Sequence, residues 1–456
     1  MPKKSLINPL IRDVWLISKV VWMVLGFNLG LFLYTFTPFL YTKFGGSDSG
    51  EALKLTVWTV IIAEVCIFLS EVPTGAMGDR FGRKKMVVAS FALYALACFI
   101  RMWIPFVFSV QCVFILAVLD TVVSAFSYTF FSGCFVAWIV DTIAERNIPE
   151  GHGSILARSW SYRFVAQIIG SIVGLTLYLT GYIFYAFCLG STISVLCALF
   201  CLVIMDEKRS VDPNKVKASL RSSVKALRTT ILDGLKISIA IPPVFYLILL
   251  YSGFKFLSDL VNYLWPVAMQ ENFGVGNKSP YWFVAVFISL VTAILGSKIL
   301  EKILAKDGKK TNNIALWLWY VVVNLVIGGV VIAFGVNNIK SSASLPLLIV
   351  TVASCQFGYG FLTPAYNTLI NNYIPAIHSD KRATIMSAGS MFLSLLTITL
   401  IFPSSGPSGQ MTAVGWMLPG VLLIVATLVL HILMRRYQRK IGEIPVPIAA
   451  PLAQGD

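Results

Sequence analysis

Charged residues are scarce in this sequence. Asp, Glu, Lys and Arg make up only 12% of the 456 residues, whereas 57% are hydrophobic and the mean hydropathy is +0.80. Soluble globular domains carry about 25% charged residues. This composition excludes an ordinary water-soluble domain, and we expect the chain to be dissolved in a lipid bilayer.

The groups that most enzymes use are scarce as well. The sequence has three histidines, and no nucleophile–base arrangement or metal-ligand cluster can be assembled around them. It has no phosphate-binding G-x-x-x-x-G-K-[ST] loop, which argues against ATP-driven pumping. The eight cysteines are scattered without a C-x-x-C pair, so neither a disulfide framework nor a zinc site is expected. We therefore expect no enzymatic activity, no metal and no cofactor, with a proton gradient as the energy source.

Long apolar runs, in contrast, recur along nearly the whole chain. A hydrocarbon core of about 30 Å is crossed by roughly 20 helical residues. Runs of Leu, Ile, Val and Phe without polar alternation favour helices over barrel strands. The sequence therefore predicts an all-α, polytopic membrane protein whose first run is a retained helix rather than a signal peptide. The twelve spans are predicted near residues 20–42, 55–77, 86–106, 111–139, 155–178, 182–204, 242–269, 281–304, 314–335, 344–371, 383–403 and 413–434.

The net charge of +15 follows the connections between these runs. Lys and Arg gather in alternate connections, and the positive-inside rule then places both termini in the cytoplasm, with the protein multi-pass in the inner membrane. The basic surplus is expected to serve orientation and contact with lipids rather than nucleic-acid binding.

One long polar stretch divides the runs six plus six. The predicted units are a first six-helix bundle over residues 1–205, a basic cytoplasmic linker over 206–236, a second bundle over 237–440 and a cytoplasmic tail over 441–456. Apolar residues in the linker recur at helical spacing, so part of it is either an amphipathic helix on the membrane surface or a solvated tether.

A motif between the second and third runs indicates the family. Residues 71–85 read EVPTGAMGDRFGRKK, which resembles the G-x-x-x-D-R-x-G-R-[RK]-[RK] signature of the major facilitator superfamily. The lead-in is typical of a poorly characterised branch. The resemblance covers essentially the whole chain and implies two pseudo-symmetric six-helix bundles, alternating access, a small-molecule substrate and a monomer.

The resemblance also implies a conformational latch. Gly75 permits close helix contact, Gly82 a tight turn, and Asp79 offers an acceptor. In the family this acceptor meets the start of helix 11, here near residues 380–383, in the outward-open state. The remaining basic motif residues would form a charge network with two residues of the next connection, or would serve only as positive-inside anchors. These residues are Arg80, Arg83, Lys84 and Lys85, with Asp141 and Arg146.

Ionisable side chains at bilayer depth are costly and therefore candidates for function. By residue count Glu64 and Arg163 lie near mid-membrane and could pair, either as a charge relay or as a static structural pair. Glu71 lies beside Pro73, whose missing amide predicts a kink. Burial favours the protonated form of such acids, as a proton carrier requires.

Two further acids complete the proton-coupling candidates, which are Glu64, Glu71, Asp120 and Asp259. Lys255 and Asp259 are four residues apart and share a helix face, where they either neutralise each other or face the central cavity. Many drug/proton antiporters of the family carry an arginine in helix 4, in the region where this sequence has Asp120. The proton-coupling role of that arginine therefore cannot be carried over to this chain. We expect Asp120 to pair with Arg101.

Helices 1, 4, 7 and 10 line the cavity in the family, and polar and aromatic residues on the predicted helices are candidates for substrate contact. With the two buried cations, the cavity candidates are Asn28, Tyr34, Arg163, Lys255, Asn262, Tyr263, Gln356, Tyr359, Tyr366 and Asn367.

These features favour proton-coupled export of an amphiphilic organic compound. The alternative is uptake of a small solute, such as an anionic metabolite held by Arg163 or Lys255. A third hypothesis, a membrane sensor or lipid-handling protein without transport, has less support because the sequence carries only short tails.

Overall fold

The structure, a computed structural model, is helical throughout the part of the chain that it describes. The described residues are 9–33, 35–45, 50–146, 152–206, 229, 232–233, 236–273, 280–306, 313–336, 344–374, 382–404 and 413–441. Eleven helices within these ranges are long and apolar enough to cross a membrane. A further long helix, α14 (Arg382–Ser404), occupies the eleventh predicted span.

Apart from the first run, the helices of the first half follow the predicted runs with ends displaced by a few residues. They are α1 (Pro9–Leu33), α2 (Phe36–Lys43), α3 (Gly50–Phe81), α4 (Arg83–Arg101), the short 3-10 helix η2 (Ile104–Phe106), α5 (Val110–Glu145), α6 (His152–Leu179) and α7 (Ile183–Ile204). Those of the second half are α10 (Pro242–Phe273), α11 (Pro280–Lys306), α12 (Asn313–Val336), α13 (Ser344–Tyr373), α14 and α15 (Ala413–Ile441).

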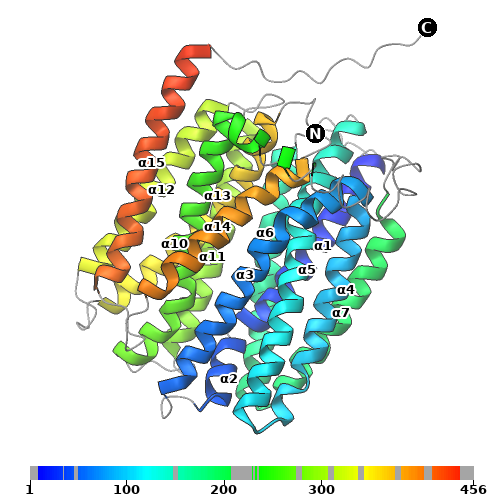
Figure 1. Cartoon of the computed structure of the whole chain (residues 1–456), viewed down its shortest axis with the longest axis vertical. Coiled ribbons are helices and arrows are strands. Elements are labelled where there is room, and N and C mark those ends of the chain that lie inside the picture. Colours follow the sequence, from blue (N-terminus) through cyan, green and yellow to red (C-terminus); the bar gives the residue numbers. More distant parts are fainter. Residues whose placement is uncertain are drawn as a thin grey trace, which may run out of the picture.

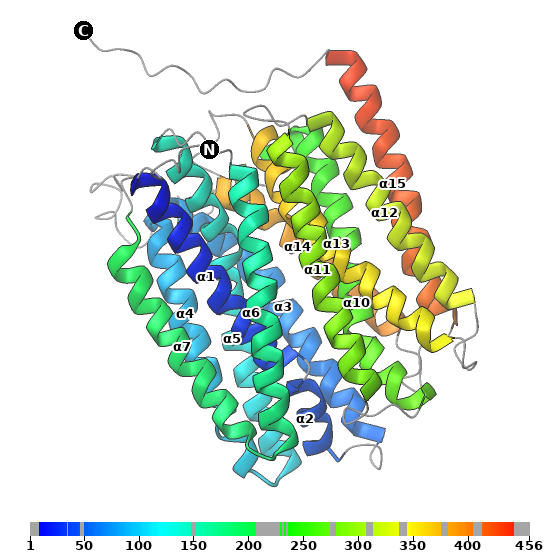
Figure 2. The same ribbon diagram turned by 180° about the vertical axis from the view of Figure 1, so that it is seen from behind.

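The two halves stand side by side as bundles of roughly parallel and antiparallel helices, one from α1 to α7 and the other from α10 to α15 (Figure 1; from behind in Figure 2). Helix α1 begins and helix α15 ends at the same end of the molecule (Figure 1). The α3–α4 turn, which carries the motif, also lies there, and we call this the Asp79 end.

Contacts between the halves involve a small set of helices. Helix α3 packs along α14, α6 packs on α11 and α13, and α5 also reaches α14. Within the first half, α1 packs most extensively on α6 and α4 on α5. The boundary between the halves is therefore formed mainly by α3 and α6 on one side and by α11, α13 and α14 on the other.

The first predicted run differs from the structure. It is divided into α1 and α2, and Thr35 is the residue that precedes the first turn of α2. Pro38 lies near the start of α2, where a missing amide is tolerated because early helical N–H groups have no partner within the helix. Helix α3, in contrast, continues across Pro73 to Phe81.

Most of the predicted linker and nearly all of the predicted tail lie outside the described residues. The four-unit division of the chain therefore stays a prediction.

Candidate functional site

One face of α3 presents polar residues and a glycine to α14. Glu64, Glu71, Gly75 and Asp79 are spaced by seven, four and four residues, which places them on one side of a helix with 3.6 residues per turn. Ala383, Ser387, Ser390 and Ser394 are spaced by four, three and four residues on α14 and likewise share one helix face. We call the contact between these two faces the α3–α14 seam.

Asp79 lies at one end of the seam, beside the first turn of α14. Its carboxylate accepts hydrogen bonds from the backbone N–H groups of Ala383 at 3.3 Å and Thr384 at 3.0 Å, and from the Thr384 hydroxyl at 3.0 Å. The first N–H groups of a helix lack partners within the helix and carry a partial positive charge. Asp79 therefore caps a helix of the other half.

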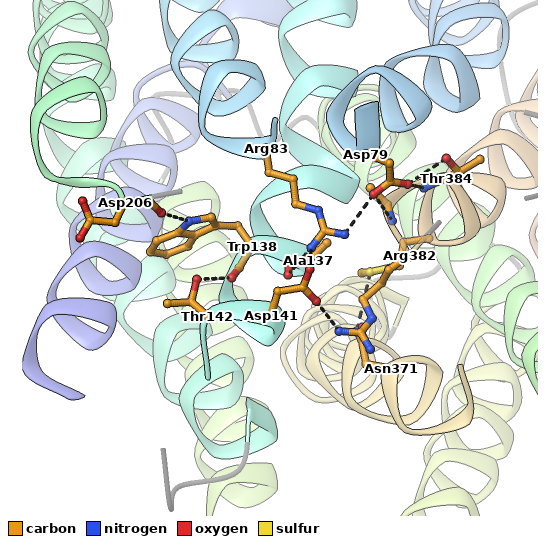
Figure 3. A network of polar contacts seen from close by, with 12 residues as sticks. Asp79, Arg83, Ala137, Trp138, Asp141, Thr142, Asp206, Asn371, Arg382 and Thr384 are labelled. Carbon is orange, nitrogen blue, oxygen red and sulfur yellow. Dashed lines mark hydrogen bonds and ion pairs between the residues drawn. The ribbon is translucent and has the colours of Figure 1, made fainter. Parts of the chain in front are cut away.

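Two arginines extend this contact into a network (Figure 3). Arg83 pairs with Asp79 at 3.0 Å and also with Asp141, and it donates to the Ala137 carbonyl at 2.8 Å. Arg382, the first residue of α14, donates to Asp141 at 2.6 Å. The Asp79 network thus joins α3, α4, α5 and α14 with two carboxylates and two guanidinium groups.

The Asp79 network differs in part from the sequence-based expectation. Arg83 and Asp141 are in it, whereas Arg146 forms an ion pair with Asp206 at 3.5 Å, and the Arg80 guanidinium stacks on the adjacent Phe81 ring at 5.4 Å. Lys84 is half-buried and Lys85 exposed. Arg382 and Thr384 were missed by the sequence analysis, although they follow directly from placing Asp79 at a helix start.

Two glycines let α14 approach the first half. A Cβ atom on Gly75 would lie 2.7 Å from the Ser387 Oγ, and one on Gly133 of α5 would lie 2.9 Å from the Ala383 carbonyl oxygen. Side chains larger than hydrogen are excluded at both positions unless α14 moves away. Gly82 joins α3 to α4 with a φ of +109°, a conformation that favours glycine.

The acids of α3 lie farther along the seam. Glu71 is fully buried; one carboxyl oxygen accepts a hydrogen bond from the Ser132 hydroxyl, and the other has no partner in the described part of the chain. Ser390 of α14 is a close neighbour. Glu64 is 9% exposed, lies close to Ser394 and forms no ion pair with a described basic side chain. Two carboxyl groups therefore lie in the boundary between the halves without an ion-pair partner among the described residues.

Two other pairs of membrane-embedded charges form local ion pairs. Lys255 and Asp259 of α10 form an ion pair at 2.5 Å, the neutralised arrangement considered for them. Arg101 and Asp120 form the expected pair at 2.7 Å, and the Arg101 guanidinium also stacks on Phe32 at 5.0 Å and Phe36 at 4.7 Å. Asp120 is therefore engaged by a buried cation, unlike Glu64 and Glu71.

The anticipated Glu64–Arg163 pair does not form. Arg163 instead lies among aromatic rings, with its Cζ 4.3 Å from the Trp160 ring centroid and 5.2 Å from that of Tyr359. Its Nη2 donates a hydrogen bond to the Tyr359 hydroxyl at 3.5 Å. Residue counting gave similar depths for Glu64 and Arg163, but Glu64 faces α14 whereas Arg163 faces α13.

Several predicted cavity residues contact one another across helices. Gln356 donates to the Asn262 amide oxygen at 2.7 Å, and the Tyr366 ring stacks on Tyr251 at 4.1 Å. Asn28 donates to Ser194 within the first half, and the Asn367 carbonyl accepts from Asn371 within α13. Tyr34 and the side chain of Tyr263 lie outside the described residues.

The serines of the seam were not among the predicted site residues. Ser387, Ser390 and Ser394 recur at intervals of three and four residues on α14, which is the spacing of one helix face. That polar stripe within an apolar span could have been read from the sequence.

Comparison with known protein families and solved structures identifies the fold. Residues 20–400 match the family model described as Major Facilitator Superfamily. A search of curated proteins finds no match.

Similar solved structures include the human organic anion transporter MFSD10 (TETRAN), at 15% identity and a TM-score of 0.67, over 93% of this chain and 100% of that one. The proton:xylose symporter XylE bound to 6-bromo-6-deoxy-D-glucose matches at 14% identity and a TM-score of 0.65, over 95% of this chain and 96% of that one. A bacterial homologue of the iron transporter ferroportin, in an outward-facing state with soaked iron, matches at 15% identity and a TM-score of 0.62, over 94% of this chain and 98% of that one. Identities this low establish the shared fold, and together with the family match they show that the chain belongs to the Major Facilitator Superfamily of membrane transporters.

Proposed function

We propose that this chain is a proton-coupled secondary transporter that moves a small organic solute by alternating access between its two halves. The observation that carries the proposal is Glu71, a fully buried carboxyl in the α3–α14 seam with one oxygen lacking any described partner. Burying an ionised carboxylate without a cation costs several kcal/mol. Glu71 therefore holds a proton while the seam is closed.

The Asp79 network supports the conformational part of this proposal. Each of its ion pairs joins side chains from two different helices. Arg382, the first residue of α14, belongs to one of these pairs. At the same end, Arg158 of α6 pairs with Glu301 of α11 at 3.0 Å. We assign this end to the cytoplasm because Lys and Arg gather there. Parting of α14 from α3 would then let cytoplasmic water reach Glu71 and accept its proton.

The direction of transport has two candidates. Export of an amphiphilic compound is the direction favoured by the sequence. Uptake of a small anionic solute is favoured by Arg163, whose guanidinium has no described carboxylate partner, because an anion and a proton that compensate each other's charges can be carried together. The shared fold alone does not decide the direction of transport, because the similar structures are named as transporters of solutes as different as organic anions, xylose and iron.

Reconstituted full-length protein tests the coupling. A panel of anionic, neutral and cationic aromatic solutes is offered to proteoliposomes under inward and outward proton gradients. We expect Glu71→Gln to abolish gradient-driven accumulation but to retain exchange at equal concentrations, because glutamine imitates the protonated acid. Glu145→Gln changes an exposed acid at the end of α5, outside the seam, and is the matched control.

Gradient-driven transport at the wild-type rate in all of Glu64→Gln, Glu71→Gln and Asp259→Asn would contradict proton coupling through these acids. Accumulation inside the vesicles under an inward gradient identifies uptake, and depletion identifies export.

A further inference from the structure

Hydrogen-bond donors without acceptors gather around Arg163. The Trp160 and Trp22 rings lie 4.8 Å apart, and the Arg163 guanidinium lies over the Trp160 ring. Each of the three side chains is at most 5% exposed. Within the described residues, Nε and Nη1 of Arg163 and the indole Nε1 atoms of Trp22 and Trp160 have no hydrogen-bond partner. Buried donors normally form hydrogen bonds, so this group of side chains lacks an acceptor.

The positive charge of Arg163 is also unmatched. A guanidinium group stays protonated in proteins, and the described residues offer it no carboxylate within ion-pair distance. Its remaining neighbours are ring faces, those of Trp160, Phe164 at 5.3 Å and Tyr359 at 5.2 Å. Ring faces attract a cation but do not accept hydrogen bonds from donors in the plane of the guanidinium.

Arg101 provides an internal comparison. It too is buried and stacks on two rings, but it has Asp120 at 2.7 Å and donates to Ser124 at 2.9 Å. Lys255, whose Nζ lies 4.7 Å from the Tyr359 ring centroid, is likewise matched by Asp259. Among these three membrane-embedded cations, Arg163 alone lacks a carboxylate within the described residues.

The position of these residues suits a ligand that enters between the halves. Arg163 belongs to α6 of the first half, whereas Tyr359 belongs to α13 of the second, and their hydrogen bond of 3.5 Å is at the long limit. On the other side α6 is held firmly, because a Cβ atom on Gly26 of α1 would lie only 2.0 Å from the Arg163 carbonyl oxygen. A ligand would displace the contacts of Tyr359 with Arg163, Trp160 and Phe164 and would meet donors that belong to α1 and α6.

We propose that Arg163, Trp22 and Trp160, closed by Tyr359, form a binding site for an organic oxyanion that carries a planar ring. The oxyanion, as in a carboxylate or sulfonate, takes the unsatisfied guanidinium and indole donors. The ring packs among the aromatic side chains of Trp160, Phe164 and Tyr359. The inference rests on the proposed transport function, since it names the class of solute carried.

Thermal stabilisation of the purified full-length protein in detergent tests the site. The probes are benzenesulfonate, which stays ionised, and benzenesulfonamide, its neutral counterpart of the same shape. We expect benzenesulfonate to raise the melting temperature and benzenesulfonamide to have little effect. Arg163→Gln should weaken benzenesulfonate binding by about 100-fold or more, because an anion would lose its charged partner.

Two further variants make the result specific. Trp160→Phe keeps a ring but removes one donor, and it should weaken binding by about 3- to 10-fold. Lys19→Gln is the matched control, because Lys19 also stacks on rings of α1 and α6, at 5.0 Å from Trp15 and 4.8 Å from Tyr162, but is half-buried and apart from the Arg163 donors. It should bind benzenesulfonate like the unmodified protein.

Three results would overturn the proposal: equal stabilisation by sulfonate and sulfonamide, unchanged binding in Arg163→Gln, or no stabilisation by benzenesulfonate or benzoate at tens of millimolar. The binding experiment needs no proton gradient. Binding that depends on Arg163 without proton-driven transport would refute the proposed function alone, and proton-driven transport that excludes anions would refute the anion site alone.

Discussion

The Asp79 network and the surroundings of Arg163 use the same kinds of side chains but match their charges differently. In the network two carboxylates and two guanidinium groups form ion pairs across four helices. Among the described residues, the buried guanidinium of Arg163 has two donors without acceptors, and in the seam Glu71 has an oxygen without a donor. Matched charges fix helices to one another, whereas unmatched charges in the boundary between the halves can be completed by a solute or a proton.

The largest expected effect comes from breaking a matched buried pair. Asp120→Asn leaves Arg101 buried without a carboxylate and should lower the free energy of unfolding by about 3–5 kcal/mol. Arg163→Met, in contrast, removes a charge that already lacks a partner and should leave stability unchanged or raise it by about 1 kcal/mol. Thermal melting of both variants in detergent measures the difference.

Equal destabilisation by these two substitutions would mean that Arg163 has a counter-charge after all. The double variant Arg101→Met with Asp120→Asn serves as the control, because it removes both charges and should recover much of the loss.

The next effect concerns the Asp79 network. Asp79→Asn removes the charge that pairs with Arg83 and faces the start of α14, and it should weaken closure of the Asp79 end by about 2–3 kcal/mol. A cysteine placed at Ser387, in a background without the native cysteines, should then react faster with a membrane-impermeant maleimide.

Thr384→Val is the matched variant. It removes one hydroxyl donor at 3.0 Å but keeps the backbone donors and the charge, and its effect should be about 1 kcal/mol. Faster labelling in Thr384→Val than in Asp79→Asn would show that charge is not what holds α14 in place.

The smallest effect tests the close approach of α14. Gly133→Ala would bring a Cβ atom to 2.9 Å from the Ala383 carbonyl oxygen and should cost about 1–2 kcal/mol. Gly329→Ala in α12 meets nothing within 4 Å, and alanine favours helix, so stability should be unchanged or slightly higher. The difference in melting temperature between the two variants measures the contact, and equal melting temperatures would contradict it.

The fold was predictable because its main determinant is local. The length of each apolar run against the thickness of a bilayer predicted α3 to α7 and α10 to α15 with small errors at the ends. The division of the first run into α1 and α2 was not predicted, because the run stays apolar across the break and Pro38 alone does not fix where a helix ends.

The site was predictable in part. Asp79 at the start of the eleventh helix was implied by the motif, and the i, i+4 spacing of Lys255 and Asp259 pointed to their pair. Arg163 was assigned the wrong partner because residue counts give depth but not direction around the helix axis. That direction depends on which helices pack together, and α3 packs on α14 while α6 packs on α13.

Helix α14 touches both Asp79, through its first turn, and Glu71, through a residue two turns later. Because α14 is one continuous helix, its movement away from one of these contacts also disturbs the other. If Glu71 carries the proton as proposed, closure of the Asp79 end and the affinity of Glu71 for its proton are linked, and each changes the other by the same factor. Under the proposed function, acidifying the medium would stabilise the closed Asp79 end, and weakening that closure would make Glu71 easier to deprotonate.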